Sequence, residues 1–153
     1  MNATELYDRL EQQVRALFDG ESDFVANAGN FAALIYDELP DVNWAGFYLA
    51  TPLGELVLGP FAGRPACTRI PRGRGVCGAA AAKRETLVVD DVDAFADHIV
   101  CDSASRSEIV VPILRDGELF GVFDVDSPLK ARFTETDRIG LERLVGAFSE
   151  SLG

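Results

Sequence analysis

Apolar residues recur at helical spacing in three stretches of the chain, at residues 4–18, 22–38 and 134–150. Apolar positions three and four residues apart lie on one face of a helix, so each stretch predicts an amphipathic helix that covers a core. Thr4 and Ser22 are suitable N-cap residues for the first two helices. Thr134 and Asp137 resemble a capping box at the start of the third.

Between these helices the apolar pattern shortens to that of β-strands. Five strands are predicted, at residues 44–50, 56–61, 87–92, 108–114 and 118–126. Gly54 suits a turn between the first two strands, and residues 115–117 (Arg-Asp-Gly) suit a turn between the last two. Pro112 lies inside a predicted strand and has no backbone N–H to donate, which favours a sheet edge or a bulge at that point.

A loop and one further helix separate the two hairpins. Residues 62–76 contain two prolines, three glycines and four arginines, which is typical of a loop, and Cys67 lies within it. Residues 75–83 (GVCGAAAAK) predict a helix of small residues with Cys77 in its first turn. This order of elements favours an α+β fold, with a mostly antiparallel sheet, the N- and C-terminal helices on one face and a loop-built pocket on the other. We expect residues 1–153 to form a single domain.

Composition narrows the range of partners. The net charge of the chain is −11, which argues against binding to the phosphate backbone of nucleic acids. No apolar run approaches the roughly 20 residues that span a membrane, and the N-terminus has no signal-peptide pattern, so we expect a cytoplasmic protein. The three cysteines, an odd number, do not indicate a structural disulfide framework in that compartment.

The stretch from Cys101 to Asp126 concentrates reactive side chains. If it forms a hairpin, the Cys101 thiol comes within reach of three carboxylates, those of Glu108, Asp124 and Asp126. Asp124 and Asp126 are two residues apart and therefore share one face of a regular strand. Carboxylates that face one cavity repel each other, which raises the pKa of at least one and leaves a proton available near neutral pH. A solvated strand face is the structural alternative, although the flanking residues are apolar.

Several motifs resemble a known family. The order of elements and the segment PRGRGVCGAAAAK are similar to those of GAF domains. The segments NWAGFYL, LVLGPFAGRPACTRIPRGRGVCG, DDVDAFADHIVCDSASRSEIVVPI and FGVFDVDS more specifically resemble the free methionine-(R)-sulfoxide reductases, GAF-fold enzymes that act on the free amino acid. The resemblance extends from about residue 23 to the last helix, and all three cysteines fall where that family has them. It implies a thiol-dependent reductase of free L-methionine-(R)-sulfoxide.

The resemblance also implies a role for each cysteine. Cys101 is the implied catalytic thiolate, which attacks the sulfoxide sulfur and becomes a sulfenic acid. Cys67 is the implied resolving cysteine, which forms a disulfide with Cys101 that an external thioredoxin-like dithiol reduces, without a bound cofactor. The arginines around Cys67 favour its thiolate form. For Cys77 an auxiliary role is implied, and a packed position in a helix is the structural alternative.

Six residues are candidates for binding the substrate, namely Trp44, Tyr48, Asp102, Glu108, Asp124 and Asp126. The three carboxylates of the hairpin would protonate the sulfoxide oxygen or hold the ammonium group, and the sequence does not assign which does which. The two aromatic residues would form a wall around the S-methyl group, although aromatic strand residues are more often part of a core. Asp102 would contact the amino-acid end. His98 is interpreted as a surface or hydrogen-bonded histidine rather than as a base or a metal ligand.

Three alternatives to the enzyme remain open. The first is a GAF module that senses a small ligand without catalysis. The second is a zinc site made from Cys67, Cys77, Cys101 and His98, although no pair of these cysteines has the short spacing usual in structural zinc sites. The third is a non-catalytic interaction domain. A homodimer formed through the terminal helices is compatible with this third alternative and with an enzyme.

Overall fold

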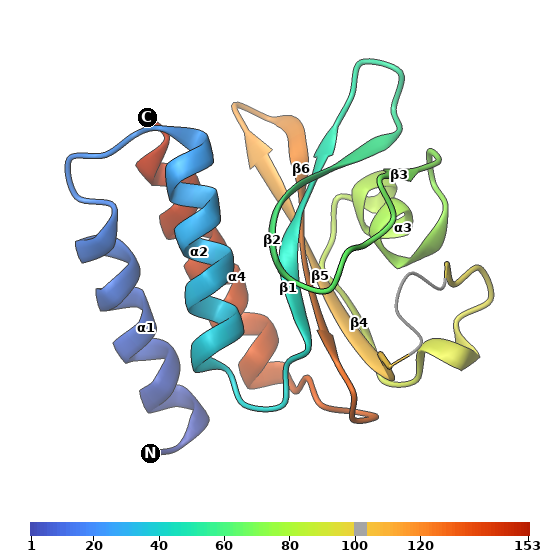
Figure 1. Cartoon of the computed structure of the whole chain (residues 1–153), viewed down its shortest axis with the longest axis horizontal. Coiled ribbons are helices and arrows are strands. Elements are labelled where there is room, and N and C mark those ends of the chain that lie inside the picture. The colour runs from blue at the N-terminus through green and yellow to red at the C-terminus, as the bar shows by residue number, and fades with distance from the viewer. Residues whose placement is uncertain (100–103) are drawn as a thin grey trace.

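The computed structural model describes residues 1–99 and 104–153 (Figure 1). Its helices are α1 (Ala3–Leu17), α2 (Phe24–Glu38), α3 (Gly75–Lys83), α4 (Glu135–Ser151) and the short 3-10 helix η1 (Val92–Ala94). Its strands are β1 (Trp44–Ala50), β2 (Leu56–Gly63), β3 (Arg69–Ile70), β4 (Leu87–Val89), β5 (Ser107–Arg115) and β6 (Glu118–Ser127).

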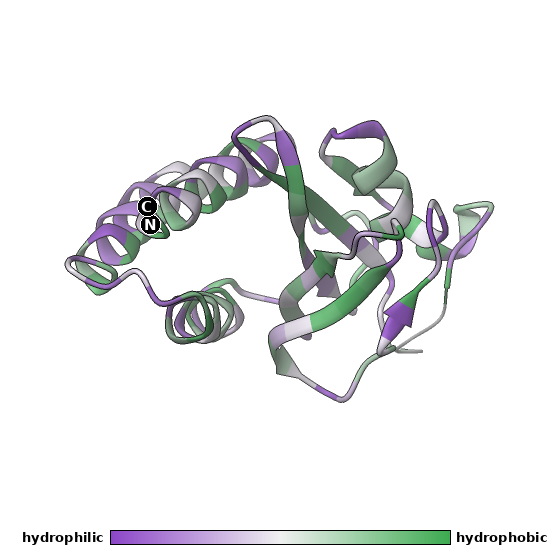
Figure 2. Ribbon diagram, turned by 90° about the horizontal axis from the view of Figure 1, so that it is seen from above, coloured by the Kyte–Doolittle hydropathy of each residue, from purple (hydrophilic) through white to green (hydrophobic). Residues whose placement is uncertain are grey.

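These strands form one antiparallel sheet in the order β3-β2-β1-β6-β5-β4. Helices α1, α2 and α4 lie on one face of the sheet, and α3 lies with the loops on the other (Figure 1). The view from above shows the same layers, with the strands coloured largely as hydrophobic (Figure 2). The predicted α+β fold class is therefore confirmed. Within the described residues, no helix is both long enough and apolar enough to cross a membrane.

Aromatic rings fill the space between the sheet and the helices α1, α2 and α4. The ring centroid of Phe31 on α2 lies 4.8 Å from that of Phe123 on β6 and 5.2 Å from that of Phe148 on α4. Phe47 on β1 lies 4.9 Å from each of the same two rings. All four side chains are completely buried. Because successive strand residues point to opposite faces, the neighbours of these strand residues point away from the helices and build the second face of the sheet.

The first two helices begin at different residues from those predicted. Asn2, not Thr4, caps α1, because its side chain accepts a hydrogen bond from the Glu5 N–H while the Glu5 carboxylate accepts one from the Asn2 N–H. Asp23, not Ser22, caps α2 by accepting a hydrogen bond from a first-turn N–H. The predicted capping box of α4 is confirmed.

The strands differ from the prediction in two places. The apolar alternation predicted no strand within residues 62–76, yet Arg69–Ile70 pairs with β2, and a strand of two residues has no alternation to detect. The strand predicted at residues 87–92 ends three residues earlier, at Val89, and η1 begins at Val92. Pro112 lies beyond Glu108–Val110, the part of β5 that pairs with β4, so it occupies the edge position that its missing N–H favoured.

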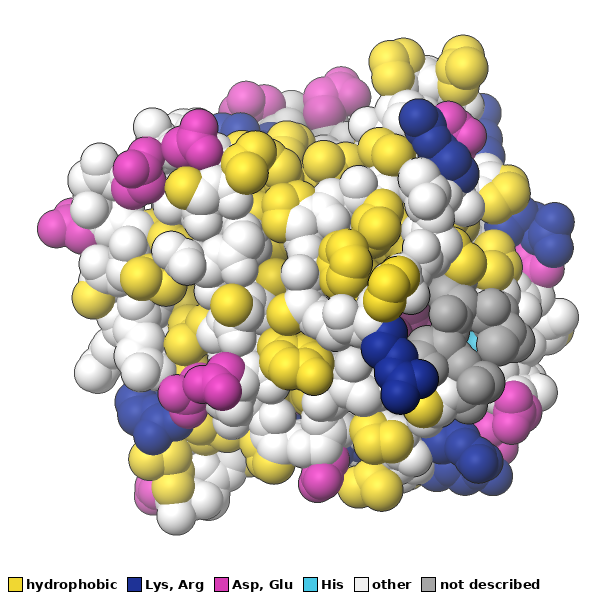
Figure 3. Space-filling model, viewed as in Figure 1, with side chains coloured by type: hydrophobic (Ala, Val, Ile, Leu, Met, Phe, Trp, Pro, Cys, Tyr) yellow, Lys and Arg dark blue, Asp and Glu magenta, His cyan; other side chains and the backbone are white. Residues whose placement is uncertain are grey.

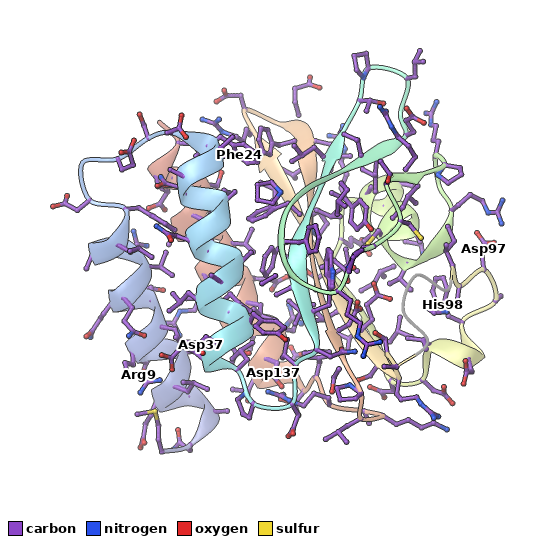
Figure 4. The ribbon with its side chains drawn as sticks, in the orientation of Figure 1. Arg9, Phe24, Asp37, Asp97, His98 and Asp137 are labelled. Atoms are coloured by element: carbon purple, nitrogen blue, oxygen red, sulfur yellow. The ribbon has the colours of Figure 1, made fainter. Side chains whose placement is uncertain are left out.

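A buried polar contact joins the N- and C-terminal helices. The Tyr7 hydroxyl donates a hydrogen bond to Asp137 over 2.7 Å, and Arg132 forms an ion pair with the same carboxylate at 3.0 Å. Asp137 lies near the start of α4 (Figure 4). Burial, followed by the nearby Asp137 carboxylate, raises the pKa of Tyr7, so the hydroxyl stays a donor. Gly140 lies against the Tyr7 ring, because a Cβ at this glycine would be 2.3 Å from a ring carbon.

We expect Gly140→Ala to destabilise the protein, because its methyl group would overlap the Tyr7 ring and overpacking costs roughly 1–3 kcal/mol. Gly146→Ala in the same helix is the matched control, since its Cβ would meet no atom within 4 Å. The higher helix propensity of alanine should make this control more stable by about 1 kcal/mol. Urea unfolding measures both changes. Equal stability of the two variants would contradict the close packing of α1 against α4.

Candidate active site

Three neighbouring strands bring acidic and aromatic side chains together on the second face of the sheet. Asp126 on β6 is paired with Trp44 on β1 at one side and with Glu108 on β5 at the other. Asp124 lies two residues earlier on β6, beside Gly46 of β1. Directly opposite side chains in a sheet are about 5 Å apart. Glu108, Asp124 and Asp126 therefore form one group, which we call the carboxyl cluster.

Helix α3 packs over the carboxyl cluster and contributes a thiol. A Cβ at Gly78 would lie 2.8 Å from the backbone of Gly73, so this glycine lets the preceding loop pack closely on the helix. Cys77 is only 4% exposed, and its Sγ donates to Glu108 Oε2 over 3.9 Å. One ligand atom each from Cys77, Glu108 and Asp124 lies within 4.8 Å of the other two. A metal ion requires deprotonated ligands, whereas burial favours the protonated forms here, so we interpret the group as one that holds protons.

Burial controls the protonation of this group. Desolvation, followed by repulsion from Asp124, raises the pKa of Glu108 well above its ordinary value. Desolvation, followed by repulsion from Asp126, raises the pKa of Asp124 in the same way. Desolvation, followed by the two carboxylates of Asp124 and Glu108, raises the pKa of the Cys77 thiol. The site therefore keeps its protons to higher pH than exposed acids do, and the first-turn position of Cys77 does not make it a thiolate.

Asp124 Oδ1 is buried and has no hydrogen-bond partner among residues 1–99 and 104–153. An unsatisfied buried carboxylate oxygen is costly, and it accepts hydrogen bonds only, so this atom suits a ligand that donates an N–H or O–H group. The neighbouring Gly46 is required by the packing around it. A Cβ there would lie 2.3 Å from Phe61 Cβ and 2.7 Å from the Trp44 ring.

Trp44 and Tyr48 form an aromatic wall beside the carboxyl cluster and also anchor a loop. Their ring centroids are 6.0 Å apart in a stacked arrangement, and Trp44 stacks on Phe61 at 5.3 Å. Trp44 Nε1 donates a hydrogen bond to the Arg64 carbonyl over 3.0 Å, and the Tyr48 hydroxyl donates one to the Cys67 carbonyl over 2.8 Å. The two buried aromatic residues therefore hold the loop that carries Cys67.

Basic side chains gather on the same side of the molecule. Most of the Lys and Arg side chains visible in Figure 3 lie on the half that carries α3 and the loops. Two of the four arginines of the loop are engaged in ion pairs, Arg69 with Glu55 and Arg74 with Asp97, each at 2.7 Å. The positive charge that acts on Cys67 is therefore smaller than the sequence suggests.

His98 lies against Glu108, with 3.9 Å between its Nε2 and Glu108 Oε1, and its side chain is 14% exposed. The neighbouring Asp97 pairs with Arg74 and accepts a hydrogen bond from the Gly75 N–H, which fixes this loop against the start of α3 (Figure 4). Desolvation lowers the pKa of His98 and favours the neutral ring. The side chain therefore lies at the edge of the site, and the interpretation as a surface or hydrogen-bonded histidine stays a prediction. The only sequence feature that indicated a place for His98 near the site was its position three residues before Cys101.

A cavity of about 40 Å³ lies between the loop that carries His98 and the carboxyl cluster. The polar side chains that line it are those of Cys77, His98, Ser105, Glu108 and Asp126. This volume accommodates a water molecule but not an amino acid. The cavity therefore marks the inner end of a site rather than the whole of one.

The three cysteines differ in their state. Cys67 takes part in a disulfide, and Cys77 is a free, buried thiol. Cys101 and Asp102 lie outside the described residues, so their roles stay predictions. The alternative zinc site would need Cys67 as a thiolate, which the disulfide does not supply in this state. The thiol that the described structure brings to the carboxyl cluster is Cys77, for which the sequence left a packed position as the alternative.

Known proteins share the fold and between 41% and 48% of the sequence. A family model of the GAF domain matches residues 12–152. The free methionine-R-sulfoxide reductase of Escherichia coli is 48% identical, over 99% of this chain and 92% of the relative. The enzyme of that name from Saccharomyces cerevisiae is 41% identical, over 99% and 88%. The X-ray structure of free methionine-R-sulfoxide reductase from Neisseria meningitidis in complex with its substrate has a TM-score of 0.95 and 47% identity, covering 99% of this chain and 91% of that one.

An antiparallel sheet with helices on one face and a site under loops on the other is the architecture of a GAF domain. The match to the family model over nearly the whole chain agrees with this class. The chain belongs to the GAF-domain family of free methionine-R-sulfoxide reductases, because two relatives of that name match it over almost their full lengths. The resemblance noted in the sequence motifs is confirmed.

We expect the free energy of unfolding to fall as the pH rises from about 5 to about 8. Glu108 and Asp124 ionise at a higher pKa in the folded protein than in the unfolded chain, so the folded protein binds more protons in this range. Each group contributes a slope of up to about 1.4 kcal/mol per pH unit. Asp124→Asn should flatten the profile, whereas Asp116→Asn in the exposed β5–β6 turn should not. Urea unfolding at several pH values measures this, and an unchanged slope in Asp124→Asn would contradict it.

Proposed function

We propose that this protein reduces free L-methionine-(R)-sulfoxide to L-methionine with electrons from cysteine thiols. The observation that carries the proposal is the buried carboxyl cluster, set beside an aromatic wall and the loop of Cys67. The 48% identity to the free methionine-R-sulfoxide reductase of Escherichia coli supports it. Reduction of a sulfoxide needs a thiolate, a second thiol and a proton source, and this chain carries candidates for all three.

Cys101 is the nucleophile of the first step. Its thiolate gives an electron pair to the sulfoxide sulfur while a carboxylic acid protonates the sulfoxide oxygen. The protonated oxygen transfers as a hydroxyl group to the Cys101 sulfur, while the new bond between the two sulfur atoms and the S–O bond of the substrate break. Methionine leaves, and Cys101 becomes a sulfenic acid. Glu108 is the acid, because its raised pKa keeps it protonated and because it borders the cavity.

Cys67 completes the transfer of electrons. Its thiol attacks the sulfenic acid sulfur, a disulfide forms, and the hydroxyl group leaves as water with the thiol proton. The disulfide at Cys67 and the free thiol at Cys77 support Cys67 rather than Cys77 as the resolving cysteine. A thioredoxin-like dithiol then reduces this disulfide and becomes a disulfide itself, so no bound cofactor is needed.

The substrate is a zwitterion with an apolar end, and the site offers complementary groups. Asp126 and the unpartnered Oδ1 of Asp124 accept hydrogen bonds from its ammonium group. Trp44 and Tyr48 border its S-methyl group with their rings. Asp102 contacts the amino-acid end. A peptide-bound methionine sulfoxide has no free ammonium group and would leave the carboxylates without their counter-charge.

Cys77 has an auxiliary role in this proposal. Its thiol donates to Glu108 Oε2 and helps to orient the acid. Its raised pKa keeps it protonated, which makes it a poor nucleophile. Cys77 therefore takes no part in the electron transfer itself.

The proposal extends to the partner, the compartment and the assembly. Dithiol donors such as thioredoxin stay reduced in the cytoplasm, so we place the protein there. Residues 1–153 act as one catalytic domain, which is supported by a single sheet flanked by elements from both ends of the chain. A homodimer through the terminal helices is compatible with activity, since those helices lie on the opposite face of the sheet from the site (Figure 1).

We expect the purified protein with a dithiol reductant to convert free L-methionine-(R)-sulfoxide and to leave the (S) epimer largely unchanged. N-acetyl-L-methionine-(R)-sulfoxide is the matched control substrate, because it has the same sulfoxide without the ammonium group that the carboxyl cluster is proposed to bind. Chromatographic measurement of the reduced product gives the three rates. Equal rates for the two epimers would refute the proposed function.

Cysteine substitutions should separate the steps. Cys101→Ser should abolish methionine formation, and Cys67→Ser should form about one methionine per protein molecule and lose recycling by thioredoxin. Cys77→Ala is the matched control and should continue through many turnovers, because this thiol is not an electron donor in the proposal. Methionine released per protein molecule distinguishes the variants. Many turnovers by Cys67→Ser would mean that another thiol resolves the sulfenic acid.

A further inference from the structure

We propose that His98 is a positioning residue that stabilises the Glu108 carboxylate as it forms during the reaction. This inference rests on the proposed function, in which Glu108 gives its proton to the sulfoxide oxygen. When that proton leaves, a negative charge develops on a side chain that is only 8% exposed. Solvent gives such a charge little stabilisation, so a neighbouring donor determines how easily the proton is released.

The geometry gives each oxygen of Glu108 a neighbouring donor. The Cys77 thiol faces Oε2 over 3.9 Å, and His98 Nε2 faces Oε1, also over 3.9 Å. For nitrogen and oxygen this distance is longer than a hydrogen bond, which suits a neutral carboxylic acid that does not need the contact. A carboxylate attracts the N–H more strongly, so the contact shortens as the proton leaves Glu108. An interaction that strengthens in this way lowers the barrier of the chemical step.

His98 is held so that little reorganisation is needed. Its loop is fixed to the start of α3, because Asp97 pairs with Arg74 and accepts from the Gly75 N–H. His98 and Glu108 border the same cavity of about 40 Å³, so the ring has room to move towards the carboxylate. A bound water molecule in that cavity is the other way in which the ring and the carboxylate could be bridged.

The surroundings of His98 favour the neutral imidazole, which can donate an N–H to Glu108. Asp93 acts on the ring electrostatically and raises its pKa, but desolvation is the larger effect and keeps the ring neutral. Burial and Asp124 raise the pKa of Glu108 most strongly, and a side-chain hydrogen bond with Asp126, which borders the same cavity, lowers it to a smaller extent. Asp97 is engaged with an arginine and a backbone N–H. A neutral imidazole with its proton on the nitrogen facing Glu108 is the donor that these surroundings favour.

Single-turnover kinetics with the fully reduced protein test the inference. His98→Ala should slow methionine formation about tenfold, the effect of losing one hydrogen bond to a charged group. Because a donor to the ionised form lowers a pKa, its removal should also move the alkaline limb of the pH–rate profile to higher pH. His98→Gln supplies an amide N–H and should recover most of the rate. Asp116→Asn, in the exposed turn between β5 and β6, is the control and should leave the alkaline limb in place.

Three kinetic results would overturn the inference. These are an unchanged rate in His98→Ala, an unmoved alkaline limb, and equal losses in His98→Ala and His98→Gln, which would indicate that only ring packing matters. A protein that forms no methionine in its unaltered form would instead refute the proposed function.

A second measurement needs neither activity nor a folded His98 variant. His98 is the only histidine of the chain, so the proton on its Cε1 atom gives a single resonance in a proton NMR titration. In the reduced protein this resonance should show a second inflection where Glu108 ionises, and Glu108→Gln should abolish it. A titration curve that is identical in the two proteins would overturn the inference whatever the kinetics show.

Discussion

Burial of the carboxyl cluster is the constraint on which the rest of the structure depends. A carboxylate removed from water and placed beside another loses solvation and is repelled, so a proton becomes its most effective counter-charge. The strands supply this arrangement because alternate residues of β6 point to one face, where Asp124 and Asp126 lie beside Glu108. The opposite face of the same strands packs apolar side chains, among them Phe47, Phe123 and Val125, against the helices. That aromatic core offsets the free energy that the site costs.

The same burial explains why Glu108, Asp124 and Cys77 have different roles in the site. An acid that is to protonate a sulfoxide near neutral pH must keep its proton there, and desolvation of Glu108 has this effect. The unpartnered oxygen of Asp124 is costly in the protein alone and becomes useful when an ammonium group binds. Cys77, which is near these groups, stays a neutral thiol for the same reason. Burial therefore both keeps Glu108 protonated and leaves Asp124 with an acceptor oxygen for the ammonium group of the substrate.

Local patterns predicted the elements but not the contacts between them. The long helices, both hairpins and the shared face of Asp124 and Asp126 followed from periodicity, which is a property of neighbouring residues. The contact of Cys77 with Glu108 depends on how α3 packs across β5, and no local pattern encodes it. The contact of His98 with Glu108 could not be predicted for the same reason, because it depends on a loop folded against α3. The roles of Cys101 and Asp102 rest on family resemblance, since neither residue lies within the described structure.

The hydrogen bonds from Trp44 and Tyr48 have a thermodynamic consequence. The rings that border the proposed methyl site are bonded to the backbone of the loop that carries the Cys67 disulfide. A ligand that binds these rings with different affinity before and after disulfide formation changes the free energy of that disulfide by the same amount, because linkage is reciprocal. Occupancy of the pocket and reduction potential are then coupled quantities. The wall of the pocket thus connects the concentration of an amino acid to the redox balance of a thiol pair.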